Sequence, residues 1–183
     1  MRRTFSAAAL ALVLVLLVAA CGSSDDGSDT SATATWADEV CSSVTTWTDS
    51  LTTSVSSLQG GNISREALEG AVDDVKGATD TLVDDLRGLG TPDTEAGQEA
   101  RDSVDQLADQ LEQEVDEIEG AVDDVSGASG VLTAISTVSA TLASMGTQLS
   151  STFDELDQLD AGGELEDAFN ESESCQGISG GSG

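Results

Sequence analysis

The sequence predicts an all-α protein, specifically an antiparallel up-down four-helix bundle followed by a short C-terminal helical segment. Apolar residues recur at spacings of three and four along four long segments. No window of useful length alternates apolar and polar residues with a period of two. Glycine or proline breaks separate the four segments. We therefore expect one helical domain over residues 35–176 and no sheet.

The first predicted helix begins at Thr35 and ends before Gly60-Gly61. Thr35 is placed to cap the helix, with Asp38 three residues on, in a pattern resembling a capping box. A single apolar stripe follows, consisting of Trp36, Val40, Val44, Trp47, Leu51, Val55 and Leu58.

The second predicted helix begins after Ser64, which is expected to be its N-cap, with Ile63 placed to contact Leu68 as a hydrophobic staple. Gly90-Thr91-Pro92 is expected to end this helix and to place Pro92 at the first position of the third. The stripe of the second helix is Leu68, Val72, Val75, Leu82, Leu86 and Leu89.

Two further stripes predict the third and fourth helices, which the segment Ser126–Gly130 separates. Gly162-Gly163 ends the fourth helix, Leu165 and Phe169 suggest a short helical segment, and residues 177–183 are expected to be a disordered tail. The third stripe is Ala100, Val104, Leu107, Leu111, Val115, Ile118, Val122 and Val125; the fourth is Val131, Ile135, Val138, Leu142, Met145, Leu149, Phe153, Leu156 and Leu159.

Residues 1–20 have the features of a secretory signal peptide: Arg2-Arg3, then an uncharged apolar run that ends in small residues. The run is short for a bilayer span. Val18-Ala19-Ala20-Cys21 is similar to the lipobox of bacterial lipoproteins, which implies lipidation of Cys21 after removal of the signal peptide. The alternative is ordinary cleavage that leaves Cys21 as a spare thiol. Residues 21–34 are then expected to be the lipid anchor and a flexible Ser/Gly/Asp tether.

The two remaining cysteines, Cys41 and Cys175, are expected to pair in an oxidising compartment, with two free thiols as the alternative. A disulfide requires their Cα atoms to lie within about 7 Å. An even number of long helices brings the two ends of the chain to one pole, and this favours four helices. The tether, Cys41 and Cys175 should then share the membrane-facing pole.

Three motifs of the chain resemble small exported lipoproteins of actinobacterial type. In addition to the lipobox, these are the Trp-Ala-Asp-Glu-Val-Cys sequence at residues 36–41, the Leu-Val-Asp-Asp-Leu-Arg-Gly-Leu-Gly sequence at residues 82–90, and the C-terminal sequence at residues 171–175, which ends in Cys175. The resemblance covers nearly the whole chain. It implies the localisation and the fold only, at the extracellular or periplasmic side of the cell membrane.

The composition argues against several classes of function. Six basic residues stand against 35 acidic ones, and the formal net charge of −29 repels nucleic acid and anionic headgroups. The chain has no histidine, so imidazole general bases and His-dependent nucleophile systems are excluded. We therefore predict that the protein is not an enzyme, and we predict no cofactor and no nucleic-acid partner.

An acidic stripe is predicted along the third helix. Like charges at this spacing destabilise a helix by about 0.2 to 0.5 kcal/mol per pair. A solvated face is the favoured interpretation and a divalent-cation site the alternative, although a straight helix does not wrap one ion and no calcium-binding loop motif is present. The stripe consists of Asp102, Asp105, Asp109, Glu112, Asp116, Glu119 and Asp123.

The fourth helix has no charge from Gly130 to Phe153, and hydroxyl residues interleave with its apolar stripe. An uncharged run of this length raises a transmembrane interpretation, which the hydroxyls weaken. We favour the interpretation that this helix is the most enclosed one of the bundle. The alternative is a hydroxyl-lined groove for a small ligand or a partner helix.

Together these features predict a membrane-anchored extracytoplasmic lipoprotein with a non-enzymatic binding or scaffolding role. Its predicted partners are the membrane, through the lipid on Cys21, and a protein of the cell envelope. The alternative function is a helical bundle that binds a small ligand or a divalent cation.

Substitution Cys21→Ser should release the protein from membranes, because it removes the thiol that the lipobox resemblance assigns to lipidation. The measurement is partitioning between the detergent and aqueous phases of fractionated cells. Continued partitioning of the variant into the detergent phase would refute the assignment.

Overall fold

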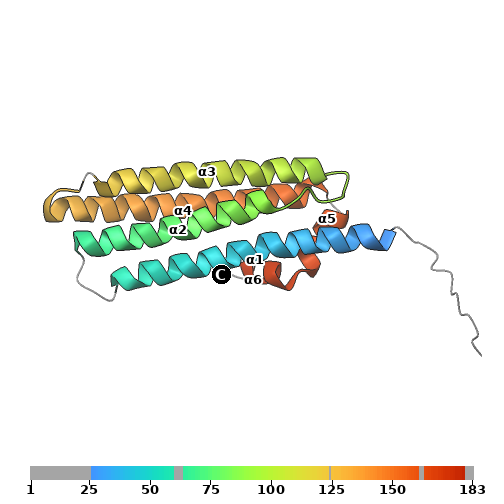
Figure 1. Ribbon diagram of the computed structural model, residues 1–183, viewed down its shortest axis with the longest axis horizontal. Coiled ribbons are helices and arrows are strands. Elements are labelled where there is room, and N and C mark those ends of the chain that lie inside the picture. Colours follow the sequence, from blue (N-terminus) through green and yellow to red (C-terminus); the bar gives the residue numbers. More distant parts are fainter. Residues whose placement is uncertain (1–25, 60–63, 124, 161–162, 180–183) are drawn as a thin grey trace, which may run out of the picture.

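The structure is a computed structural model that describes residues 26–59, 64–123, 125–160 and 163–179. These residues form six helices and no strand: α1 (Asp26–Gln59), α2 (Arg65–Gly88), α3 (Gly97–Asp123), α4 (Gly127–Leu159), α5 (Glu164–Glu171) and α6 (Glu173–Ser179). The four long helices run up and down, each antiparallel to the long helix before it (Figure 1). The prediction of an all-α helical bundle with a short C-terminal segment is confirmed.

The bundle is open along one side. Helix α1 packs along α2, α2 along α3, and α3 along α4. Helices α1 and α4 have no extended contact within the described residues. The short helices lie at this opening, since α5 contacts both α1 and α4 while α6 contacts α1 and α5. The C-terminal segment therefore lies where a closed bundle would join its first and last helices.

The predicted apolar stripes form one core across α1 to α5. Both tryptophans are buried in it, and each indole finds a hydrogen-bond acceptor on the side of α2. Trp36 Nε1 donates to the carbonyl of Gly90 at 2.9 Å, and Trp47 Nε1 donates to Thr79 Oγ1 at 3.0 Å. Buried indoles usually need such a partner, so these two bonds fix how α1 sits on α2.

Helix α1 begins well before the predicted start at Thr35. It is helical from Asp26, so residues 26–34 belong to the helix rather than to the predicted flexible tether. Thr33 is fully buried and lies one turn before Ala37, which is fully buried as well. The buried stripe therefore extends upstream of Trp36, where polar and small residues conceal it in the sequence. Thr35 is not an N-cap, and residues 1–25, including Cys21, lie outside the described residues.

The connection between α2 and α3 also differs from the prediction. Ser64 is the N-cap of α2, as predicted, and its side chain accepts a hydrogen bond from the N–H of Ala67; the predicted contact of Ile63 lies outside the described residues. Pro92 does not begin α3, which starts only at Gly97. A Cβ on Gly97 would lie 1.9 Å from the carbonyl oxygen of Pro92. The loop folds back on the helix start, so only glycine fits there.

The ends of the last helices were misplaced in the sequence prediction. Helix α4 begins at Gly127, whose φ of 70° favours glycine, and not after a break that extends to Gly130. Helix α6 continues to Ser179, so the predicted tail from residue 177 is helical at its start. Residues 180–183 lie outside the described residues. Because α1 starts early, Cys41 lies well inside α1 and not at a pole of the bundle, and the C-terminal segment runs back along α1 to reach it (Figure 1).

Arg101 on α3 holds the C-terminal end of α2. Its guanidinium donates to the carbonyls of Leu86 at 2.9 Å and Arg87 at 3.0 Å, and also to the carbonyl of Leu89. It is paired with Asp105 one turn on, at 2.6 Å. The last carbonyls of a helix have no partner within the helix, and a cation suits this negative end of the helix dipole. Arg101 therefore acts as the C-terminal cap of α2 from a neighbouring helix.

Substitution Arg101→Met should lower the free energy of unfolding by about 2 kcal/mol, because it leaves the terminal carbonyls of α2 without their charged donor. Equilibrium urea denaturation measures the change. Lys76→Met is the matched control, since Lys76 makes one ion pair, with Glu119, that is exposed on both sides. It should change the stability by less than about 0.5 kcal/mol. Equal losses in the two variants would contradict the capping role.

Candidate functional site

The disulfide between Cys41 and Cys175 joins α1 to α6, as predicted. The two Cα atoms are 5.0 Å apart, and both cysteines are buried. The sulfur of Cys175 also lies 3.6 Å from the carbonyl oxygen of Ala37, one turn before Cys41. The bond closes a loop of 134 residues and fixes the C-terminal segment against the middle of α1.

Ser172 supports this junction from the start of α6. Its hydroxyl donates to Asp38 Oδ1 on α1 at 2.9 Å and accepts from the N–H of Cys175 at 3.3 Å. The second bond is that of an N-cap residue. The hydrogen bond from Ser172, followed by those from Ser174, lowers the pKa of Asp38 below its ordinary value of 3.8. A buried hydroxyl thus links the carboxylate of α1 to the helix that carries Cys175.

A cleft of about 420 Å³ lies between the C-terminal half of α4 and the disulfide-linked segment. We call it the disulfide cleft. Ligand pockets in proteins span about 300 to 1,000 Å³, so the volume suits a small organic molecule. Its lining comes from four helices and consists of Cys41, Leu149, Ser150, Phe153, Asp154, Asp157, Phe169, Asn170, Cys175 and Ile178.

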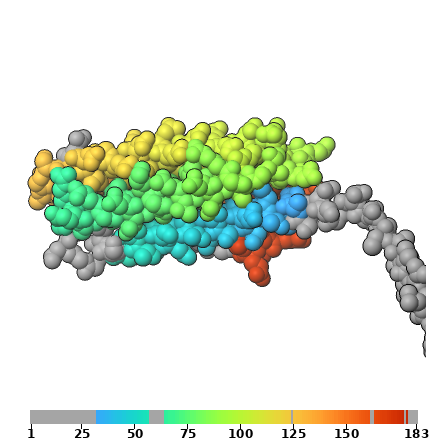
Figure 2. Space-filling model, in the orientation of Figure 1, coloured from blue at the N-terminus to red at the C-terminus, as the bar shows by residue number. Residues whose placement is uncertain are grey.

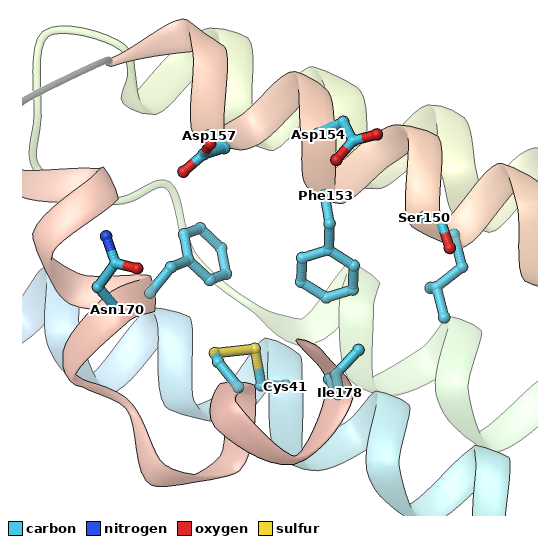
Figure 3. A pocket seen from close by; sticks show the side chains of 10 residues that line it. Cys41, Ser150, Phe153, Asp154, Asp157, Asn170 and Ile178 are labelled. Carbon is cyan, nitrogen blue, oxygen red and sulfur yellow. A yellow bond between two sulfur atoms is a disulfide. The ribbon is translucent and has the colours of Figure 1, made fainter. Parts of the chain in front are cut away.

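The inner part of the disulfide cleft is aromatic and apolar. Figure 3 shows Phe153 pointing from α4 toward the disulfide, with Ile178 of α6 on the opposite side. The rings of Phe153 and Phe169 meet edge to face, with centroids 5.9 Å apart, and Phe169 meets Trp36 in the same way at 5.9 Å. Edge-to-face pairs are a favoured packing of aromatic rings. The wall is therefore a connected aromatic row that reaches from α4 through α5 to α1.

The outer edge of the cleft is acidic. Asp154 and Asp157 lie one turn apart on α4, and their carboxylates stand along the rim in Figure 3, across from Asn170. Residues at this spacing are neighbours on a helix surface. Both side chains are exposed. The cleft therefore combines an apolar interior with two adjacent negative charges at its mouth.

The basic residues of the helical domain all lie on the other side of the bundle. The sequence beyond residue 20 has four of them: Arg65, Lys76 and Arg87 on α2, and Arg101 on α3. Each has a partner there, and none lines the disulfide cleft in the described part of the chain.

The acidic stripe of α3 faces α2 and is partly neutralised by these cations. Arg87 forms two bonds with Glu112, at 2.7 and 2.8 Å, and one with Asp109 at 2.7 Å. Lys76 pairs with Glu119 at 3.0 Å. The pKa of Glu112 is lowered by its hydrogen bonds from Arg87, and that of Arg87 is raised in turn. The predicted solvated face is therefore in part an interface between α2 and α3.

The residues that the structure describes contain no cluster of three His, Cys, Asp or Glu side chains that could hold a metal ion. Three carboxylates of the stripe are instead bound to Arg87 or Lys76. The stripe thus gives no support to the alternative of a divalent-cation site.

The expectation that α4 is the most enclosed helix is wrong. Among the described residues it is the one helix long and apolar enough to cross a membrane, yet only 28% of that apolar stretch is buried in the bundle. Its buried side chains form one row, and Leu132 is 65% exposed. The reason is the opening between α1 and α4, which leaves α4 packed mainly on α3. A large part of the uncharged surface of α4 therefore faces outward.

Four hydroxyls of α4 bond within their own helix. Thr133, Thr137, Thr147 and Ser150 each donate to the carbonyl four residues earlier. A shallow groove of about 420 Å³ does lie beside the start of α4, lined by Ser129, Thr133 and Thr137 among others. Because Thr133 and Thr137 donate to carbonyls of their own helix, these two hydroxyls present only acceptors to the groove.

No family model matches the chain, and neither a curated protein sequence nor a solved structure matches it. The fold and the cleft thus define a class only: an all-α bundle whose C-terminal segment is joined to its first helix by a disulfide. The surface of this chain is seen in Figure 2, where part of the red C-terminal segment projects beside the blue first helix.

The sequence analysis placed Cys41 and Cys175 together correctly but missed the cleft that forms beside them. The apolar spacing places Phe153 and Phe169 in separate segments, and it gives no reason to single out Asp154 and Asp157. One signal was available. The chain has three phenylalanines, Phe5, Phe153 and Phe169, and the last two meet in this cleft.

Substitution Ser172→Ala should raise the pKa of Asp38 toward its ordinary value, because it removes the hydrogen bond that contributes most to the shift. A carboxyl whose pKa is lowered by folding stabilises the protein at pH values above its pKa in the unfolded state. This stability is lost as the pH falls through the pKa of the folded state. The difference in unfolding free energy between wild type and variant should therefore narrow below pH 3.8. NMR titration of the Asp38 carboxyl carbon and acid denaturation measure the two effects.

Ser139→Ala is the control, because Ser139 is an exposed hydroxyl on α4, away from Asp38. It should leave both the pKa and the acid denaturation curve unchanged. An unchanged pKa of Asp38 in Ser172→Ala would show that the hydroxyl does not bind the carboxylate in solution.

Proposed function

We propose that this protein is a lipid-anchored extracytoplasmic binding protein without catalytic activity, and that the disulfide cleft is its binding site. The observation that carries the proposal is the cleft itself, about 420 Å³ beside α4, with an aromatic interior and polar groups at its mouth. Small-molecule sites are typically concave, mostly apolar and equipped with a few polar groups that orient the ligand.

The cleft is held by fixed elements, which favours a preformed site. One wall is a long helix, and the opposite wall is tied to α1 by the disulfide and by the bond from Ser172 to Asp38. A preformed site loses less conformational entropy when a ligand binds. The absence of histidine from the sequence, together with a cleft lined by no Cys thiol, favours binding over nucleophilic catalysis.

Anchoring through Cys21 remains a proposal that rests on the lipobox resemblance of residues 18–21. The disulfide supports export, because disulfides persist in oxidising compartments. Localisation at the outer side of the cell membrane follows from these two features together.

A protein partner is the second candidate, and the exposed surface of α4 favours it. This helix carries no charge between Gly130 and Phe153, although the chain as a whole is strongly acidic. Depletion of charged residues is a mark of the central part of protein interfaces. A scaffolding role would use this surface, while the cleft at the C-terminal end of the same helix would bind the ligand.

Native mass spectrometry of the full chain, purified from host membranes in a mild nonionic detergent, tests the binding role. We expect a small organic molecule to be retained in the wild-type protein. Substitution Ser150→Trp should abolish its retention, because it fills the cleft from an exposed rim position without removing a core side chain. Ser151→Trp adds the same indole at the adjacent exposed position, which does not line the cleft, and should retain the ligand.

Recovery of the wild-type protein with no bound mass would contradict the proposal of a ligand-binding protein. Equal loss of the ligand in the two tryptophan variants would place the site elsewhere on α4. A protein partner found in the same preparations in place of a small molecule would favour the scaffolding role.

A further inference from the structure

We propose that the ligand of the disulfide cleft is a small organic cation with an apolar, preferably aromatic, body. This inference rests on the proposed function and specifies the chemical class of the ligand. It joins two properties of the cleft that are independent of one another: its apolar interior, which includes two aromatic rings, and the charge at its mouth.

The interior selects for an apolar body. Leu149, Phe153, Phe169 and Ile178 line it, and the buried disulfide closes the wall formed by α1 and α6. Burial of apolar ligand surface against these side chains is favourable in proportion to the area removed from water. A bare metal ion or a small hydrophilic anion would gain nothing from this lining.

The mouth selects for positive charge. Asp154 and Asp157 are neighbours on one face of α4, and their mutual repulsion is relieved when a cation lies between them or beside them. No basic side chain of the described chain lies in the cleft, since Arg65, Lys76, Arg87 and Arg101 are all engaged at α2 and α3. The two carboxylates therefore offer a countercharge that the protein itself does not supply.

The aromatic rings extend the same preference into the cleft. The face of a phenyl ring attracts an organic cation within about 6 Å of its centroid, and quaternary ammonium groups are recognised in this way. Phe153 lies directly next to Asp154 in the chain and points inward from the rim, as Figure 3 shows. A cationic head held near the rim therefore has both a carboxylate and a ring within reach.

The overall charge of the molecule acts in the same direction. Its formal net charge of −29 raises the local concentration of cations and lowers that of anions near the surface. Fatty-acid carboxylates and phosphorylated ligands would meet both this field and the two aspartates. Among ligands with an apolar body, the cleft thus discriminates by the sign of the head group.

Isothermal titration of the full chain in a nonionic maltoside detergent with two matched probes tests the inference. The probes are benzyltrimethylammonium and 3-phenylpropionate, which share a phenyl ring and differ in the sign of their charge. We expect saturable binding of the cation and at least tenfold weaker binding of the anion, with an affinity for the cation that falls as salt is added.

The double substitution Asp154→Asn, Asp157→Asn should weaken binding of the cation about tenfold. Asp73→Asn, Asp84→Asn is the matched control, because it removes the same charge from exposed positions on α2 outside the cleft. It should change the affinity less than twofold. Phe153→Leu should weaken binding of the cation while keeping the apolar lining, and thermal unfolding should show that all these variants remain folded.

Equal affinity for the two probes, or equal loss in the two double variants, would overturn the inference. Binding of neither probe would overturn it as well. These outcomes are separate from failure of the proposed function, which is tested by the mass retained from host membranes. A neutral or anionic retained molecule that is lost in Ser150→Trp would refute the cationic ligand and leave the binding role intact.

Discussion

The disulfide between Cys41 and Cys175 is the constraint on which the rest of the structure depends. Helices α5 and α6 have eight and seven residues, and isolated helices of that length are unstable in water. The disulfide holds them against α1, where Leu165 and Ala168 of α5 enter the core. By the loop-entropy argument, closing so long a loop contributes about 5 kcal/mol. Without it, the side of the bundle between α1 and α4 would lose its cover, and the cleft would lose a wall.

The distribution of charge follows a second constraint, the scarcity of basic residues. With four cations available beyond residue 20, the fold places all of them on α2 and α3. There they offset the acidic stripe and cap α2 through Arg101. The surface ion pairs are individually weak. Together they concentrate the positive charge on one side of the molecule. The opposite side, with Asp154 and Asp157, is left without a countercharge.

Apolar spacing in the sequence predicts the helices in which buried residues recur regularly every three or four positions. The stripes of α2 and α3 predicted their buried faces, and the cysteine count predicted the disulfide that joins α1 to α6. The start of α1 was not predictable from apolar spacing, because Thr33 is polar and nevertheless buried. The enclosure of α4 was misjudged because periodicity reports one buried face and says nothing of how many neighbours a helix has. The cleft arises from that missing neighbour, so its lining could not be read from any single segment.

The early start of α1 changes how the cleft would relate to the membrane under the proposed anchoring. The predicted flexible tether of residues 21–34 becomes a few residues before a helix that begins at Asp26. A chain from residue 21 to residue 26 reaches at most about 18 Å. From Asp26 to Cys41 the helix adds a rigid rise of about 22 Å. The cleft lies on the half of the bundle that holds the N-terminal end of α1 (Figure 1). Under the proposed anchoring it would therefore stand at a limited distance from the headgroups.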